Sequence, residues 1–386
     1  RMLQQSAAYL LAQGAQTGQQ RVKSLWLIPG LGRAKKTAQT NGKRLRRGVM
    51  STQKICSSSS RIEFGDCRDT MRRWAAEGVK AQMCVTSPPY FGLRDYGHPG
   101  QLGLEQTPEQ YVAAMVEVFR CVWDVLADDG TLWLNIGDSY ASPTKGSGGT
   151  GKSTLVGTPN DGNGQLFASR KFDMSGYKPK DLIGIPWMLA FALRADGWFL
   201  RQDIIWHKPN PMPESVRDRC TKAHEYIFLL SKSERYFFDA EAIEEPVTGN
   251  SSTGAKKPST LAGGKGANGK TQTGGKESST LGLGWHKSTR NRRDVWTVPV
   301  RPYKGAHFAT FPPALIEPCI LAGSRPGDLV LDPFMGSGTT AAVSIQHGRG
   351  YLGCELNPEY GPLQEERIQS ANDCLPMIAD LFEVAA

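Results

Sequence analysis

The chain has 386 residues, of which 39% are hydrophobic, 22% are charged and 9% are aromatic. This composition excludes a fibrous repeat, a small disulfide scaffold and a chain that is disordered throughout. No apolar run reaches the roughly 18 to 20 residues of a membrane-spanning helix, so we expect no membrane partner. The eight cysteines are scattered and none forms a Cys-x-x-Cys pair, which favours a reduced, cytoplasmic compartment.

The formal net charge of +9 is distributed unevenly. Residues 1–60 contain 11 Lys and Arg and no Asp or Glu, and residues 247–293 contain nine basic residues and one acid. The remainder of the chain is therefore acidic. This pattern indicates that two particular segments, rather than the whole fold, contact a polyanion such as DNA.

Residues 1–60 are predicted to be a basic leader or tail without stable structure. Three interpretations are open. The segment is an appended or over-translated leader, because Met50-Ser51 is a plausible start; or it is a basic arm for nucleic acid; or it is an Arg-rich transit peptide. We favour the first interpretation.

Apolar periodicity predicts seven strands with helices between most of them. The strands are expected at 61–66, 81–86, 131–136, 199–206, 226–230, 328–331 and 350–354. Helices are expected at 69–77, 107–126 and 182–195, and after the glycine-rich turn that follows residue 331, while Asp128-Asp129-Gly130 is expected to stop the helix at 107–126. This alternation predicts an α/β fold with a largely parallel sheet, which binds its ligands at the carboxyl ends of the strands.

Two polar stretches, 141–180 and 247–293, interrupt the alternation and are too long to be simple connections. We interpret them as functional insertions or disordered loops. The predicted organisation is a leader or tail at 1–60, a catalytic half at 61–246, a basic target-recognition insertion at 247–295, a cofactor-binding half at 296–370 and a C-terminal tail at 371–386.

A glycine turn, Asp332-Pro-Phe-Met-Gly336-Ser-Gly338, lies between a predicted strand and an Ala-rich helix. Glycines permit a tight turn and close backbone approach to a ligand, and a helix N-terminus favours an anionic group. Glu355 follows at the end of the next strand, where an acid can accept hydrogen bonds from both ribose hydroxyls. A structural turn alone would explain the glycines, but the strand, the helix and the spaced acid together favour a nucleoside-type cofactor.

A second motif, Ser87-Pro88-Pro89-Tyr90, ends another predicted strand. The lone pair of an exocyclic base amine is delocalised into the ring, so the amine needs two acceptors for its hydrogens before it becomes nucleophilic. The Ser87 hydroxyl and the Pro88 carbonyl are candidates for these acceptors, and Tyr90 offers a stacking face for a flipped base. A Pro-Pro turn without function is the alternative for this motif taken alone.

Together, the two motifs resemble those of the DNA amino-methyltransferases, which transfer a methyl group from S-adenosyl-L-methionine to N4 of cytosine or N6 of adenine. The resemblance covers roughly residues 61–366. It implies a seven-stranded, Rossmann-like methyltransferase sheet. Because the tetrapeptide precedes the cofactor turn, the order is similar to that of the circularly permuted β class, whose target-recognition region lies between the two.

The resemblance also implies residue roles. Asp332 would contact the methionine amino group of the cofactor, and Glu355 would hold its ribose. The predicted cofactor-binding residues are Asp66, His307, Phe308, Asp332, Phe334, Gly336, Ser337, Gly338 and Glu355, and the predicted catalytic residues are Ser87, Pro88, Pro89 and Tyr90. The predicted DNA contacts are Lys256, Lys257, Lys265, Lys270, Lys276, Lys287, Arg290, Arg292 and Arg293.

Three other patterns are assigned no function. Gly146–Ser153 fits the phosphate-loop pattern but lacks the flanking strand and helix, so a Gly/Ser insertion is expected. Cys319 lies in an apolar stretch and is expected to be a buried cysteine rather than the nucleophile of cytosine-C5 methylation. The six histidines never pair at metal-ligand spacing, so no metal is expected.

The predicted activity is therefore direct methyl transfer to the amine of a flipped base in double-stranded DNA. The tetrapeptide resembles the cytosine-N4 form, in which serine stands in place of the aspartate or asparagine usual for adenine, and this resemblance favours N4 of cytosine, with N6 of adenine a close second. Two alternatives stay open: an enzyme of the same fold that acts on RNA or a protein amide, and a DNA-binding module with an inactive site. A homodimer and a cognate restriction nuclease are further expected partners.

Overall fold

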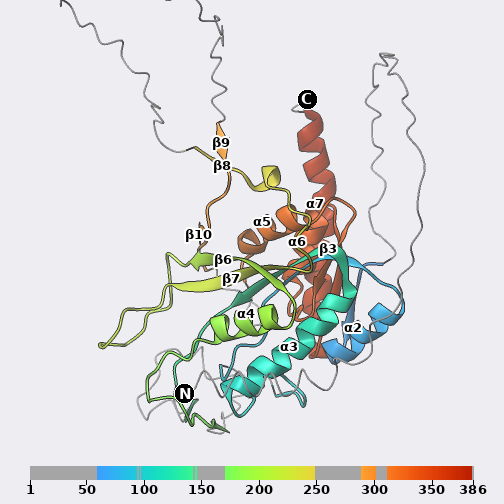
Figure 1. Cartoon of the computed structure of the whole chain (residues 1–386). Coiled ribbons are helices and arrows are strands. Elements are labelled where there is room, and N and C mark those ends of the chain that lie inside the picture. Colours follow the sequence, from blue (N-terminus) through green and yellow to red (C-terminus); the bar gives the residue numbers. More distant parts are fainter. Residues whose placement is uncertain are drawn as a thin grey trace, which may run out of the picture. The chain divides into compact units, whose positions relative to one another are not determined.

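A mixed β-sheet of eight strands organises the chain (Figure 1). The structure is a computed structural model that describes residues 59–93, 95, 97–141, 144–145, 170–247, 288–300 and 311–384. Across the sheet, the strands are β1 (Arg61–Phe64), β12 (Gly350–Glu355), β11 (Leu329–Asp332), β2 (Ala81–Thr86), β3 (Leu126–Ile136), β7 (His224–Ser231), β6 (Phe199–His207) and β10 (Val295–Thr297). Two short pairs stand apart, β4 (Thr144–Lys145) with β5 (Arg170–Lys171), and β8 (Glu245–Pro246) with β9 (Thr289–Arg290).

One strand, β7, runs against the others. It pairs antiparallel with both β3 and β6, whereas the remaining neighbours in the sheet pair in parallel. The carboxyl ends of seven strands therefore meet at one edge of the sheet, and the amino end of β7 joins them there. This edge is where a parallel sheet places its ligands.

Helices cover both faces of the sheet (Figure 1). One layer contains α2 (Cys67–Ala76), α3 (Pro108–Val125) and α4 (Ile185–Ala195). On the other face α5 (Pro313–Gly323) and α6 (Thr339–Gln346) pack on the strands, and α7 (Gly361–Val384) packs on α6. Short 3-10 helices lie at Glu241–Ile243 and Pro358–Tyr360.

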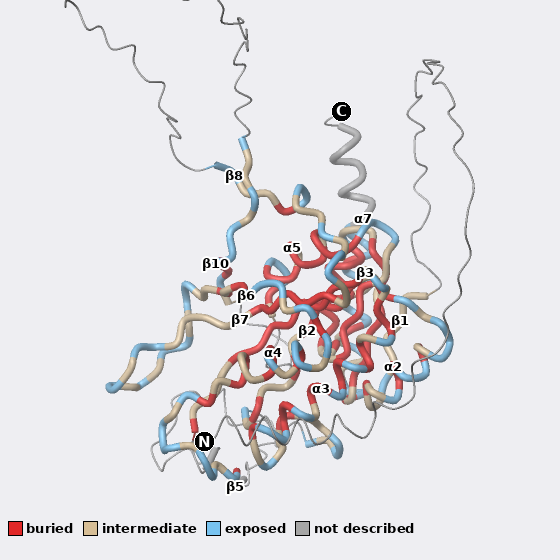
Figure 2. Tube along the Cα trace, in the orientation of Figure 1, coloured by how far each residue is buried: buried red, intermediate tan, exposed pale blue. Residues whose placement is uncertain are grey.

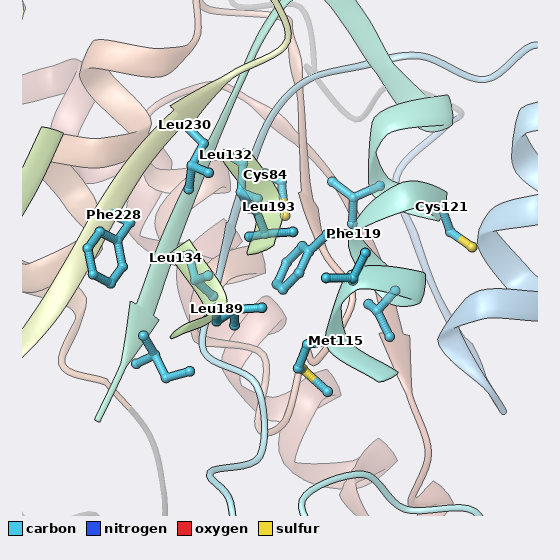
Figure 3. Packing of buried hydrophobic residues seen from close by; sticks show 14 of the residues in the cluster. Cys84, Met115, Phe119, Cys121, Leu132, Leu134, Leu189, Leu193, Phe228 and Leu230 are labelled. Carbon is cyan, nitrogen blue, oxygen red and sulfur yellow. The ribbon is translucent and has the colours of Figure 1, made fainter. Parts of the chain in front are cut away.

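The alternation of side chains along the strands produces the two cores. In β3, Leu132 and Leu134 face α3 and α4, as Figure 3 shows, while Trp133 between them packs in the cluster that contains α5. α3 presents its buried stripe, including Met115 and Phe119, to the first core, and a capping box on Thr107 fixes its start. Figure 2 shows the buried residues concentrated along the central strands and on the sheet-facing sides of the helices.

The α/β prediction is confirmed, and all seven expected strands are present. The strand count is corrected to eight, because β10 has only three residues and offers no periodicity to detect. The helix expected to stop before Asp128-Asp129-Gly130 does so, since α3 ends at Val125, and these three residues belong to β3, whose pairing with β2 shifts register between Ala81 and Met83. The expected boundary at residue 370 falls inside α7.

Candidate active site

Predicted site residues from distant parts of the sequence lie at one edge of the sheet. Asp332 ends β11, Ser87 follows β2, and Glu355 ends β12. These three strands are neighbours in the order β12–β11–β2, so the glycine turn and the tetrapeptide lie side by side. A direct hydrogen bond joins them, because Thr86 Oγ1 donates to Asp332 Oδ1 over 2.6 Å.

The Asp332 carboxylate is buried and hydrogen-bonded to groups in and beside the turn. Asp332 is only 1% exposed. Besides the Thr86 hydroxyl, its carboxylate accepts hydrogen bonds from Thr340 Oγ1 at 2.6 Å and from the Phe334 N–H at 3.0 Å. Burial raises the pKa of this carboxyl to about 6, although these hydrogen bonds favour the ionised form. The Asp332 side chain, at the centre of the turn, is therefore an ionised carboxylate near neutral pH and becomes protonated in mild acid.

The glycine turn has the geometry that its sequence requires. Gly336 and Gly338 have φ of 54° and 81°, a left-handed backbone that favours glycine. Glu355 Oε2 accepts the Gly336 N–H at 2.8 Å, so the acid predicted to hold a ribose also shapes the turn. Ser337 Oγ is buried and, among the described residues, has no hydrogen-bond partner. An unsatisfied buried hydroxyl in such a turn indicates a site completed by a ligand.

Asp66 and Glu355 are neighbours at the same edge. The Gly65 N–H donates to the Glu355 carbonyl at 2.8 Å, which ties the end of β1 to the end of β12. The Asp66 carboxylate caps α2 and receives the Arg68 guanidinium on both oxygens, and this hydrogen bonding lowers its pKa. Burial raises the pKa of Glu355. Each of its carboxylate oxygens accepts one backbone N–H, from Gly336 and from Asn357.

The tetrapeptide is fixed by contacts on both sides. Tyr111 Oη, from α3, donates to the Pro89 carbonyl at 2.9 Å. Pro88 is buried, while Ser87 and Tyr90 are half-buried. Ser87 Oγ lies 3.4 Å from Tyr90 Oη and donates to it. Among the described residues the Pro88 carbonyl receives no hydrogen bond, so it and the Ser87 oxygen are the acceptors still available.

Sequence reasoning missed the group that holds Tyr90. Tyr90 Oη donates to Glu225 Oε2 at 2.7 Å and lies 3.3 Å from Asn135 Oδ1. Lys208 forms an ion pair with the other Glu225 oxygen. Burial, followed by the Glu225 charge, raises the pKa of the Tyr90 phenol well above its usual value, so it stays protonated. Only the strand topology could have indicated this residue, because Glu225 lies at the amino end of β7, which is antiparallel to its neighbours.

The predicted DNA contacts are only partly described. Lys256, Lys257, Lys265, Lys270, Lys276 and Lys287 lie outside the described residues, as do the cofactor candidates His307 and Phe308 and the phosphate-loop pattern Gly146–Ser153. The three described arginines have partners within the protein. Arg290 and Arg293 both bind Glu245, over 2.8 and 2.6 Å, and the Arg292 guanidinium lies 4.7 Å from the centre of the Trp296 ring.

The described part of the chain bears on three further features: a metal site, the environment of Cys319 and a membrane-spanning helix. There, no group of three His, Cys, Asp or Glu side chains has the arrangement of a metal site. Cys319 is buried within α5, as expected, and burial raises the pKa of its thiol. Within the same residues, no helix combines the length and apolar character needed to cross a bilayer.

Comparison with known proteins identifies the family. The sequence model of a DNA methylase family that covers N6 and N4 enzymes matches residues 81–366. The chain belongs to this N6/N4 DNA methylase family. It is accordingly an S-adenosylmethionine-dependent DNA methyltransferase, which sets aside the RNA, protein-amide and inactive-module alternatives.

Two relatives that match over most of their own length, M.Cfr9I and M.SmaI, support this assignment. The type II methyltransferase M.Cfr9I of Citrobacter freundii is 45% identical over 315 residues, which are 82% of this chain and 89% of that protein. M.SmaI of Serratia marcescens is 46% identical over 313 residues, which are 80% and 91% of the two chains. Among solved structures, the PvuII DNA methyltransferase, described as cytosine-N4-specific, is similar over 81% of this chain and 91% of its own, with a TM-score of 0.49 and 18% identity.

Proposed function

We propose that this methyltransferase methylates N4 of cytosine in double-stranded DNA, with the target base flipped into a pocket formed by Ser87–Tyr90. The observation that carries the proposal is the hydrogen bond between Thr86 and Asp332. It joins the residue before Ser87 to the acid of the glycine turn, so amine acceptors and cofactor site are held at a fixed separation. Such positioning is the main source of rate in a direct transfer without a covalent enzyme intermediate.

Ser87 and Pro88 are the proposed acceptors for the two amine hydrogens. The Ser87 hydroxyl donates to Tyr90, so the lone pairs of its oxygen are free to accept. Accepting both hydrogens draws the amine nitrogen toward tetrahedral geometry and frees its lone pair for the methyl group. In the family that the motif resembles, serine at this position goes with methylation of the cytosine amine. N6-methyladenine is the competing product.

The glycine turn and its neighbours fit S-adenosylmethionine. When bound, the cofactor supplies an electrophilic methyl group. We propose that Asp332 holds its amino group, that Phe334, Gly336, Ser337 and Gly338 line it, and that Glu355 accepts its ribose hydroxyls. The unsatisfied Ser337 hydroxyl supports this assignment. His307 and Phe308 stay predictions from the resemblance.

Asp66 is a weaker candidate for the adenine amine of the cofactor than the resemblance alone suggests. Its carboxylate already accepts the Arg68 backbone N–H at 2.8 Å and the Arg68 guanidinium on both oxygens. A contact between Asp66 and the adenine amine therefore requires the Arg68 side chain to move.

The segment between the two motifs is the proposed target-recognition region, as in a permuted chain. The pairing of β8 with β9, together with a hydrogen bond from the Val247 N–H to the Ser288 carbonyl at 3.0 Å, joins the described residues on either side of positions 248–287. That segment contains the six predicted DNA-binding lysines. Clustered lysines supply the sequence-independent part of DNA affinity.

The biological setting follows from the relatives, which are type II methyltransferases. We propose that the enzyme works inside the cell, in a restriction–modification system, beside a nuclease that cleaves the same unmethylated sequence. A homodimer stays a prediction from the sequence.

Nucleoside analysis tests the proposal. DNA methylated by the purified enzyme with S-adenosylmethionine is digested to nucleosides, which are separated by chromatography and identified by mass. N4-methyldeoxycytidine is the expected product. N6-methyldeoxyadenosine in its place would overturn the choice of base, and 5-methyldeoxycytidine would overturn the amine chemistry, because methylation of the ring carbon requires a cysteine nucleophile.

A further inference from the structure

We propose that Glu225 is a positioning residue for methyl transfer, which acts through Tyr90 on the Ser87 hydroxyl. The proposal rests on the proposed function of Ser87 as an acceptor for the target amine. It assigns a role to a residue that lies outside the tetrapeptide and outside the cofactor turn.

Glu225 connects three other parts of the site through one carboxylate. Its Oε2 receives the Tyr90 hydroxyl at 2.7 Å and the Asn135 side-chain N–H at 3.3 Å, and its Oε1 receives the Lys208 ammonium. Tyr90 follows β2, Asn135 lies in β3, and Lys208 follows β6. The Glu225 and Lys208 side chains are only 16% and 18% exposed, so this charged group is shielded from competing water.

The charge of Glu225 sets the direction of a chain of hydroxyl groups. A carboxylate can only accept, so the single Tyr90 proton points to Glu225. Tyr90 Oη is then an acceptor on its other side, where Ser87 Oγ lies 3.4 Å away and donates its proton. With that proton directed to Tyr90, the Ser87 lone pairs are available to the target amine. Without the carboxylate, the Tyr90 proton is free to rotate toward Ser87 or toward Asn135 Oδ1, 3.3 Å away.

Glu225 also fixes the position of the Tyr90 ring. The ring packs against Gly137, where an added Cβ would lie 2.6 Å from Tyr90 Cε2. Backbone on one side and the Glu225 hydrogen bond at the hydroxyl therefore define the face offered to a flipped base. Lys208 is itself fixed, with its ammonium 4.3 Å from the centre of the Trp206 ring. The positioning group thus extends from the tetrapeptide to the end of β6.

The test is a double-mutant cycle with Glu225→Gln and Tyr90→Phe. The first substitution keeps the shape of the side chain and removes its charge, and the second keeps the ring and removes the hydroxyl. Each single variant is expected to lower kcat by about 10- to 100-fold, the usual range for loss of a hydrogen bond to a charged group. The dissociation constant for S-adenosylmethionine is expected to stay within about twofold of wild type, since the polar partners of the two side chains are Ser87, Asn135, Lys208 and each other, none of which belongs to the glycine turn.

Coupling distinguishes this role from a merely structural one. If Glu225 acts through the Tyr90 hydroxyl, Glu225→Gln lowers kcat by less than about twofold in the Tyr90→Phe background. Glu214→Gln is the matched control, because Glu214 pairs with Arg219 in the β6–β7 loop and contacts none of the site residues described above. It is expected to retain wild-type kcat.

Two results would overturn the inference. One is wild-type kcat in Glu225→Gln, and the other is a double variant whose loss of kcat equals the product of the losses in the two single variants. Total methyl incorporation is measured together with the identity of the methylated nucleoside. A wild-type product other than N4-methyldeoxycytidine then refutes the proposed base, while the coupling still decides the role of Glu225.

Discussion

Gly137→Ala should separate methyl transfer from cofactor binding by moving a single ring. Gly137 follows β3, is buried and does not have a positive φ, so its backbone accepts alanine without strain. The added methyl group would lie 2.6 Å from Cε2 and 3.1 Å from Cδ2 of Tyr90. Ordinary carbon–carbon contact begins near 3.5 Å, so the Tyr90 ring has to move by about 1 Å.

The size of the effect follows from that displacement. Tyr90 has to keep a 2.7 Å hydrogen bond to Glu225, and a shift of about 1 Å takes the two oxygens out of hydrogen-bonding range if it is directed away from the carboxylate. A misplacement of about 1 Å near reacting groups can cost about 100-fold in rate, or about 2.7 kcal/mol in activation free energy. We expect kcat to fall by about that factor while the affinity for S-adenosylmethionine is unchanged.

The assay is transfer of labelled methyl groups to DNA under saturating substrates, with calorimetry for cofactor binding. Gly361→Ala is the matched control, because its added Cβ meets only Phe64 Cζ at 3.5 Å and its backbone is helical. That variant should be as active as wild type and slightly more stable, by about 0.4 to 1 kcal/mol. Wild-type kcat in Gly137→Ala would refute the role assigned to the position of the Tyr90 ring.

Three further predictions concern the cofactor site and the recognition segment. Burial raises the pKa of Asp332 to about 6, so the carboxylate protonates below that pH. Calorimetry across pH 5–8 should therefore show that the affinity of the wild-type enzyme for the cofactor falls by up to about tenfold per pH unit below about pH 6. The Asp332→Asn variant should bind the cofactor weakly at every pH in that range. Glu245→Ala should free Arg290 and Arg293, so the salt dependence of non-specific DNA binding steepens by up to about 0.9 per added phosphate contact, and an unchanged slope would show that neither arginine reaches DNA. Replacing residues 248–287 with a short Gly-Ser linker should preserve cofactor affinity and abolish sequence-specific methylation, and retained specificity would place the recognition region elsewhere.

The sequence allowed prediction of the parts of the site that are local along the chain. Gly336, Gly338 and Glu355 belong to one strand–turn–helix–strand unit, so their spacing alone indicates their proximity. The tetrapeptide likewise carries its own signal in two consecutive prolines. The Thr86–Asp332 contact, by contrast, joins residues 246 positions apart, and only the strand order makes it visible.

Glu225 illustrates what the sequence could not provide. A search of the carboxyl ends of predicted strands overlooks it, because it lies near the start of β7. The antiparallel direction of that strand brings its amino end to the ligand edge, and the apolar pattern of a strand does not encode its direction. The ion pairs of Arg290 and Arg293 were missed for a related reason, since their partner Glu245 lies on the other side of the insertion.

The most direct test of the account compares Ser87→Ala with wild type for cofactor binding and methyl transfer in the same preparation. The account assigns Ser87 to the target amine and the glycine turn to the cofactor. It therefore predicts an unchanged dissociation constant for S-adenosylmethionine and a large loss of single-turnover methylation, about 100-fold or more for loss of a positioned group that contacts the reacting amine. Methylation at the wild-type rate would contradict the central claim, and so would a loss of cofactor binding that accounts for the lost activity.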